Sequence, residues 1–471
     1  MLFVESRTTE STIDQRLRLA LLERLQEERG LVPLIRSTRL RCYETALLGA
    51  ERVDELEQSL AASSSAEEDS AYVRGDLFCF EEFVLFLIFD DEKGARRGTR
   101  AGIVYEAEMT DAHKELDAFC RNVGEALNAV RGSLDGYVLE TIEWRQCGPD
   151  EMPGFEGFSA GSETDVEAGV ETQTTREASR AAEVLEETGA RKLLRRIREA
   201  HADGSVPDLL SSLKGKTETE ALMRRLAEVG LLRREVVISC RQSGRSLFRL
   251  PSPDALPVIT TSNAICSECG ANIADEKIDE LVVPTDVAAT LLEDGSWLNS
   301  RLRSSLLQLG VPQEQIINGP ISVDGEAYMM VRVCHEPFLF VLKDGDVTGA
   351  HARHALGKQN ETEAPHLIVV ATGKIQDDAR TRLREHARRR SRSGSLVEVL
   401  LIETVETASG ELQQAFERVS MRAVAEELSA LDASLGLGVG QMLAARFRLM
   451  RRSDGLKDIA APAVGALNAS L

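Results

Sequence analysis

Two short cysteine-containing segments have residue types and spacing suited to binding a metal ion. Cys266 and Cys269 are separated by two residues and followed by Gly270. Such a turn lets two thiolates reach one tetrahedral Zn²⁺. Upstream, Cys240 and Ser243 repeat this spacing and are also followed by a glycine. The two segments therefore predict a zinc site with Cys240, Cys266 and Cys269 as ligands.

This predicted site lacks one thiolate, because Ser243 stands where a fourth cysteine would be expected. A serine hydroxyl stays protonated near neutral pH and is a poor ligand for Zn²⁺. Water, Glu268, Asp275 or a histidine would have to complete the coordination. Two alternatives stay open: the turns fold without metal, or Cys266 and Cys269 form a redox pair.

Lys343 and the acids near it form a second group of candidate functional residues. Lys343 ends an apolar segment and is followed by Asp344, Gly345 and Asp346, while Glu326 starts the preceding strand pattern. Carboxylate oxygens bind Mg²⁺, and a lysine can steady the attacking water of a nuclease. The candidate catalytic residues of an active nuclease are therefore Glu326, Lys343, Asp344 and Asp346. The alternative is that Lys-Asp-Gly-Asp is an ordinary turn.

The segment from residue 286 to residue 406 resembles the restriction-endonuclease-like fold. Its pattern predicts a helix, a strand, a hairpin, a helix, a strand, a helix and a strand. The resemblance implies an acid on the second strand, an acid two residues before a lysine on the third, and a glutamate on the first helix. Lys343 matches that lysine. Positions where acids are expected are occupied by Val341, Asn299, Ala327 and Tyr328. We therefore expect a nuclease-like domain that is not an active enzyme; the alternative is a Mg²⁺-dependent nuclease with relocated acids.

The preceding segment resembles a winged helix-turn-helix. Three helical patterns between residues 178 and 229 are followed by an alternating strand pattern that ends at Ser239. The resemblance implies that the third helix, around residues 218–227, is the recognition helix. The next residues, 240–280, carry the cysteine turns and resemble a zinc ribbon that has lost one ligand.

Basic residues are concentrated in this predicted winged helix and in one later helix. Lysines and arginines outnumber acids between residues 191 and 249, although the whole chain carries a net charge of −21. Contact with nucleic-acid phosphates requires such a local excess, because the basic side chains release condensed counterions. The candidate nucleic-acid-binding residues are Lys214, Lys216, Arg224, Arg225, Arg233, Arg245, Arg388, Arg389 and Arg390. The alternatives are a solvated basic surface and a winged helix that pairs with protein.

The composition limits the class of protein. The chain has 471 residues, of which 43% are hydrophobic and 28% charged, as is usual for globular proteins. Its longest apolar run, residues 83–89, is far shorter than the about 20 residues needed to cross a bilayer. The first residues lack the pattern of a secretory signal, so we expect a cytoplasmic protein without membrane contact. The eight cysteines do not form a disulfide framework.

The pattern along the chain predicts a multidomain protein of α/β and α+β type. An acidic segment rich in Gly, Ser and Thr follows an N-terminal part in which we find no catalytic motif. The predicted parts are an α+β domain of unknown role (1–147), an acidic flexible linker (148–177), the winged helix-turn-helix (178–239), the degenerate zinc ribbon (240–280), the restriction-endonuclease-like domain (286–406), and C-terminal helices with a tail (408–471).

These features lead to one leading hypothesis. We predict a modular prokaryotic protein that binds nucleic acid as an accessory component of genome defence or transcription control. DNA is the expected nucleic acid, and RNA is the alternative. The alternatives are a Mg²⁺-dependent nuclease and an interaction scaffold that docks a protein partner through residues 1–147. Gly-rich phosphate loops and dinucleotide fingerprints are absent from the sequence, so ordinary metabolic enzymes have little support.

Overall fold

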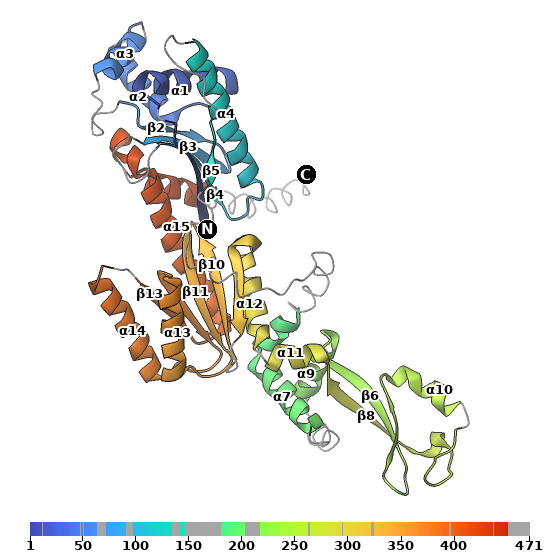
Figure 1. Cartoon of the computed structure of the whole chain (residues 1–471). Coiled ribbons are helices and arrows are strands. Elements are labelled where there is room, and N and C mark those ends of the chain that lie inside the picture. Colours follow the sequence, from blue (N-terminus) through green and yellow to red (C-terminus); the bar gives the residue numbers. More distant parts are fainter. Residues whose placement is uncertain are drawn as a thin grey trace, which may run out of the picture.

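The computed structural model describes most of the chain as three β-sheets with helices around them (Figure 1). This confirms the coarse prediction of a mixed α/β, multidomain protein. Among the described residues, no helix is both long and apolar enough to cross a membrane. The acidic linker predicted at 148–177 lies outside the described residues. The structure describes residues 1–11, 13–47, 49, 51–63, 72–90, 98–133, 142–146, 180–202, 217–261, 264–293, 295–321, 325–394, 397–436 and 438–450.

The N-terminal part is an antiparallel sheet, in the order β2-β3-β4-β1-β5, with helices on both faces. Its elements are β1 (Leu2–Thr9), α1 (Gln15–Arg29), α2 (Leu34–Ala46), α3 (Val53–Ser63), β2 (Gly75–Cys79), β3 (Phe83–Asp90), β4 (Gly98–Glu106), α4 (Ala112–Ser133) and β5 (Arg145–Gln146). Apolar residues of α1 and α4 pack on one face, and those of the C-terminal helices pack on the other. Phe78, Phe86 and Phe89 are buried, as the apolar pattern of this segment predicts.

Two features of this sheet differ from the sequence prediction. The segment 76–89 reads as one strand, but the Phe80 N–H donates to the Phe83 carbonyl (3.0 Å) and closes a turn between β2 and β3. The sequence pattern also gave no strand at Leu2–Thr9, which pairs with β4 along its whole length. Its second half is polar, so period-2 alternation is weak there. The strand predicted at 137–144 falls largely outside the described residues.

The second sheet, β13-β12-β11-β10-β9, contains the strands predicted for the nuclease-like segment. β9, β10 and β11 are antiparallel neighbours, while β11, β12 and β13 are parallel. The elements are α12 (Ser296–Gln308), η5 (Gln313–Gln315), β9 (Ile316–Ile321), β10 (Glu326–Val333), β11 (Glu336–Lys343), α13 (Gly349–Thr362), β12 (His366–Ala371), α14 (Asp377–Arg392) and β13 (Glu398–Ile402). The carboxyl ends of the parallel strands meet the start of β10, and we call this place the carboxyl edge (Glu326, 343–348 and 372–376).

Helices cover both faces of the second sheet. Alanines of α13 pack with Leu383 of α14 against one face. The other face is covered by α12 and by α15 (Val405–Leu435), where Phe416 meets Phe338 of β11 with ring centroids 5.0 Å apart. α15 continues to the first sheet, where the buried Glu427 pairs with Arg100 of β4 at 3.0 Å. One helix therefore joins the two sheets, and residues 439–450 form a further helix on the first (Figure 1).

The third sheet, β7-β6-β8, projects from the rest of the molecule (Figure 1). Its surrounding elements are α7 (Thr188–Ala202), α9 (Thr217–Glu228), β6 (Leu232–Ser239), β7 (Ser246–Leu250), η3 (Pro253–Ala255), α10 (Leu256–Thr260), η4 (Ile273–Asp275), β8 (Lys277–Pro284) and α11 (Asp286–Glu293). β6 pairs with β8 from Leu232–Pro284 to Ser239–Lys277, and residues 240–276, which include β7, connect the two strands at the Ser239–Lys277 end. The helix predicted over 284–309 is divided into α11 and α12 by Gly295, whose φ is 66°.

Asp76 predicts a pH dependence of folding. Its buried carboxylate accepts hydrogen bonds from the N–H groups of Ile35, Arg36 and Leu77 at 2.7–2.9 Å. Burial outweighs these bonds and raises the pKa of Asp76 from 3.8 to about 6. The folded state therefore binds the proton more tightly, and this stabilisation is present below about pH 4 and is lost as the pH rises through 6.

We expect the free energy of unfolding of the wild type, relative to Asp76→Asn, to fall by about 2 kcal/mol between pH 4 and pH 7. Urea unfolding of both proteins at several pH values measures this difference. A difference that stays constant or grows with pH would contradict the assignment.

Candidate functional site

The two cysteine turns have the same backbone geometry. In each, the N–H of the first cysteine, Cys240 or Cys266, donates to the carbonyl five residues later at 2.7–2.8 Å. The glycines, Gly244 and Gly270, donate back to the cysteine carbonyls at 2.8–2.9 Å. Both glycines have positive φ, 71° and 75°, which other residues adopt only with strain. The repeated spacing in the sequence therefore corresponds to two equivalent turns.

These turns bring three cysteines together with Glu276, which immediately precedes β8. One ligand atom from each of Cys240, Cys266, Cys269 and Glu276 lies within 4.8 Å of all the others. An ideal tetrahedron of Zn–S bonds has edges of about 3.8 Å, so a small inward movement would close the site. Cys240, Cys266 and Glu276 are only 1–3% exposed. This group has the number and type of ligands that a structural metal site needs.

Hydrogen bonds already link the members of this cluster. The Cys269 thiol donates to one oxygen of Glu276 at 2.9 Å, and the Arg241 N–H donates to the other at 2.6 Å. The bond to Glu276 raises the pKa of Cys269 to about 12, while the bond to Cys269 lowers the pKa of Glu276. Hydrogen bonding from Ser243 lowers the pKa of Cys240. A bound cation would replace the thiol proton that Cys269 and Glu276 share.

The fourth member of the cluster differs from the ligands that the sequence suggested. Glu268 pairs with Arg245 at 3.1 Å, and neither Glu268 nor Asp275 belongs to the cluster. Ser243 is exposed, and its hydroxyl accepts from the Arg245 N–H. Sequence reasoning missed Glu276 because this residue lies outside both cysteine turns. The available signal was the Asn272-capped turn η4, which returns the chain to the first turn.

At the carboxyl edge, Glu326 and Lys343 are direct cross-strand neighbours. Glu326 is 1% exposed, and one of its oxygens accepts from the Tyr328 hydroxyl at 2.7 Å. His351 Nε2 lies 3.8 Å from the other oxygen, and His354 Nδ1 lies 3.5 Å from the first. The structure therefore places both histidines of α13 beside this carboxylate.

The hydrogen bonding of His351 argues against metal binding between Glu326 and this histidine. His351 Nδ1 accepts from the Thr348 N–H at 3.0 Å, which caps α13. In the neutral ring the proton must then sit on Nε2, the nitrogen that faces Glu326. A metal ion needs a lone pair on Nε2, so His351 is better suited to donate to Glu326 than to bind a cation.

The other two candidate acids are held by neighbouring donors. Asp344 accepts from the Thr372 hydroxyl at 2.7 Å, from Trp297 Nε1 at 2.9 Å and from Arg195 of α7 at 2.5 Å. Asp346 is exposed and accepts from the Lys374 N–H at 2.8 Å. Among the described residues, three or more ligand-type side chains come close enough to hold a metal in the cysteine cluster, formed by Cys240, Cys266, Cys269 and Glu276. The acids of the carboxyl edge do not form such a group.

The candidate nucleic-acid-binding arginines are spread over three places. Arg224 and Arg225 are exposed on α9, and Arg225 pairs with Glu187 at 2.9 Å. Arg233 pairs with the buried Glu235, and Arg245 pairs with Glu268. Arg388, Arg389 and Arg390 lie in the last turns of α14. Lys214 and Lys216 lie outside the described residues.

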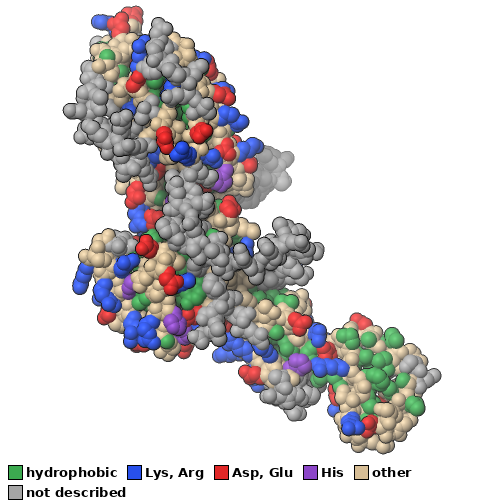
Figure 2. All heavy atoms as spheres, viewed as in Figure 1, with side chains coloured by type: hydrophobic (Ala, Val, Ile, Leu, Met, Phe, Trp, Pro, Cys, Tyr) green, Lys and Arg blue, Asp and Glu red, His purple; other side chains and the backbone are tan. Residues whose placement is uncertain are grey.

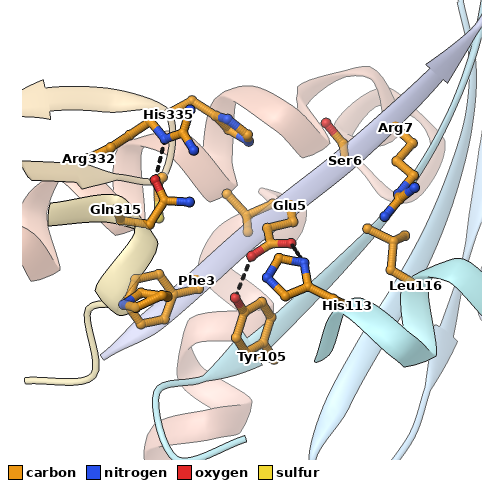
Figure 3. Close-up of a pocket in the computed structure, with 13 residues that line it drawn as sticks. Phe3, Glu5, Ser6, Arg7, Tyr105, His113, Leu116, Gln315, Arg332 and His335 are labelled. Carbon is orange, nitrogen blue, oxygen red and sulfur yellow. Dashed lines mark hydrogen bonds and ion pairs between the residues drawn. The ribbon is translucent and has the colours of Figure 1, made fainter. Parts of the chain in front are cut away.

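A pocket between the first sheet and the turn after β10 also gathers titratable side chains (Figure 3). Glu5 accepts from the Tyr105 hydroxyl at 2.6 Å and pairs with His113 at 2.8 Å. On the other side of the pocket, Arg332 donates to Gln315. The free volume of about 40 Å³ accommodates water but not an organic substrate. Glu5, Tyr105 and His113 belong to the N-terminal part, and Gln315 and Arg332 belong to the part around the second sheet, so each of these contacts lies within one part.

Comparison of the chain with protein families, with curated proteins and with solved structures finds no match in any of the three.

Proposed function

We propose that this chain is a nucleic-acid-binding protein whose winged helix carries a zinc site at the end of its wing, and whose nuclease-like domain does not cleave. One observation carries the proposal: the cysteine–glutamate cluster lies where β6 ends and β8 begins, and the opposite end of this strand pair, Leu232–Pro284, follows shortly after the arginine-bearing helix α9. A metal there would hold the far ends of the wing strands together. The proposed partner is DNA, with RNA as the alternative, in an accessory role in genome defence or transcription control.

Zinc is the metal that best fits the ligands. Three thiolates are soft donors, which disfavour Mg²⁺ and Ca²⁺, and a closed four-ligand set is typical of structural zinc. Cys240, Cys266, Cys269 and Glu276 would hold the ion, each as one ligand. Zinc contributes stability here because the ribbon has a small apolar core of its own, formed mainly by Val236, Ile238, Leu250 and Ile273.

Loss of the carboxylate should weaken metal binding. We expect Glu276→Gln to reduce zinc affinity about tenfold to 100-fold, because a neutral amide replaces an anionic ligand. The matched variant Glu268→Gln should have little effect, since Glu268 lies on the same module outside the cluster. Competition against a coloured zinc chelator measures both affinities. Equal affinities of the two variants would exclude Glu276 as a ligand.

The proposal of a non-cleaving domain depends on the carboxyl edge. Val341 is buried in the sheet at the position where the resemblance implies an acid. Asp344 already accepts three hydrogen bonds. If its carboxylate turned to bind Mg²⁺, Arg195 and Trp297 Nε1 would lose their acceptor. The adjacency of Glu326 and Lys343 favours the second candidate, a Mg²⁺-dependent nuclease. Mg²⁺-dependent cleavage that disappears in Lys343→Ala would support that candidate.

Neutralising the arginines of α9 tests nucleic-acid binding. We expect Arg224→Ala with Arg225→Ala to weaken duplex DNA binding about tenfold and to reduce the slope of log affinity against log salt by one to two, because two phosphate contacts are lost. Fluorescence anisotropy over a salt series measures both quantities. Arg52→Ala, at the exposed residue immediately before α3, is the control. If the double variant binds like this control, α9 does not contact DNA.

A further inference from the structure

The nuclease-like domain and the winged helix are joined by a set of contacts that we call the joint, formed by Arg191, Arg195, Trp297 and Asp344. Trp297 is fully buried, and the guanidinium of Arg191 lies over its ring, 4.7 Å from the centroid. Arg195 and Trp297 Nε1 both donate to one oxygen of Asp344. The joint therefore fixes the orientation of α7 relative to the carboxyl edge.

A second ion pair supports the joint. Glu186, in the helical segment 180–186 before α7, pairs with Arg301 of α12 at 2.8 Å, and both side chains are less than 20% exposed. Partly buried ion pairs with this geometry are weakly screened by salt. The two modules are thus held together at two residues of α12, Trp297 and Arg301, which fixes their relative orientation.

Exposed basic side chains lie on both sides of the joint. Arg384, Arg388 and Arg392 are spaced four residues apart on α14, so they occupy one face of that helix. Lys192 and Arg196 are exposed at the same spacing on α7. None of these five forms an ion pair within the described part of the chain. α14 carries few acids beyond its first turn, so these charges are not cancelled locally.

Basic side chains of both helices are visible on one face of the molecule. Figure 2 shows Lys and Arg side chains over α14 and over α7 in one view, with histidine over α13 between them. Arg353 of α13 is also exposed and makes no ion pair within the described residues. α13 packs beside α14 against the same face of the sheet. We call the exposed basic side chains of α14, α13 and α7 the band.

We infer that this band is a single surface for the phosphate backbone of duplex DNA, and that the joint holds its two halves in register. The inference rests on the proposed function, because it extends DNA contact from the winged helix to the nuclease-like domain. Contacts with phosphates carry no sequence information, so we expect binding through the band to be independent of sequence. Two rigidly linked halves bind a long duplex more tightly than either half alone.

A duplex-length series on the full chain tests this surface. We expect affinity to rise about 100-fold between duplexes of about 10 and about 30 base pairs, measured by anisotropy at constant salt. Arg384→Gln, Arg388→Gln and Arg392→Gln together should remove most of this gain and leave binding of the shortest duplex unchanged. The matched control is Arg16→Gln, Arg41→Gln and Arg52→Gln, three exposed arginines of the N-terminal helices and their flanks. This control should keep the full gain.

The joint is tested by Asp344→Asn with Glu186→Gln, which removes two acids and no base. Electrostatics alone would make this variant bind DNA more tightly, whereas loss of the joint should cut the gain with length at least about tenfold. A thermal unfolding curve identifies any general loss of folding.

If affinity does not rise with duplex length and the α14 variant binds like its control, the proposed surface is wrong. Binding of the short duplex in that case would still support the proposed function. Absence of all binding would overturn both, and a preference for duplex RNA would overturn the assignment to DNA.

Discussion

Cys266→Ser is expected to lower zinc affinity by at least about 100-fold and to unfold the ribbon at residues 240–276. Cys266 is 2% exposed and lies among the other ligand atoms, so its replacement leaves a hydroxyl that stays protonated near neutral pH. In structural zinc sites the free energy of metal binding is also free energy of folding. The small core of the ribbon cannot replace it.

Two measurements check this expectation on the full chain. Competition with a zinc chelator gives the affinity, and hydrogen exchange reports the protection of β7 and of residues 264–276. Cys42→Ser, at an exposed cysteine of α2, is the control and should match the wild type. If Cys266→Ser binds zinc like this control, the cluster is not a metal site.

Trp297→Ala is expected to lower the free energy of unfolding by about 3–5 kcal/mol, the range for removing a buried aromatic side chain. The change also leaves Arg191 without its aromatic ring and Asp344 without the indole donor. We therefore expect α7 and the third sheet to separate from the second sheet, with an increased radius of gyration in solution scattering.

Trp297→Phe separates the two roles of this side chain. Phenylalanine keeps an aromatic face under Arg191 but cannot donate to Asp344, so a loss of about 1–2 kcal/mol is expected. Urea unfolding measures both variants, and scattering of Trp297→Phe should resemble that of the wild type. An unchanged radius of gyration in Trp297→Ala would contradict the role of Trp297 in the joint.

The strands of the second sheet could be predicted because they are continuous apolar runs. Buried strands such as His366–Ala371 are apolar on both faces, so their sequence departs sharply from the surrounding helices and loops. Leu2–Thr9 gave no such signal, since its polar second half resembles a loop. Its place as an interior strand is set by pairing with β4, about a hundred residues later.

The candidate site was predicted where its residues repeat a spacing typical of metal ligands. Cys240, Cys266 and Cys269 lie in two turns of the same pattern, whereas Glu276 lies outside both turns and joins them through the return of the chain into β8. Asp344 illustrates the same limit: the sequence suggested a turn residue or a displaced Mg²⁺ ligand. Its donors include Arg195, which is 149 positions away, and no local pattern encodes such a contact.

The measurement that tests the central claim most directly is the affinity of the full chain for duplex DNA over a salt series with Mg²⁺ present, followed by gel analysis of the DNA. We predict binding that weakens steeply with salt, because released counterions drive it, and DNA that stays intact. Absence of binding at low salt, or cleavage of the DNA by the wild type, would contradict the account.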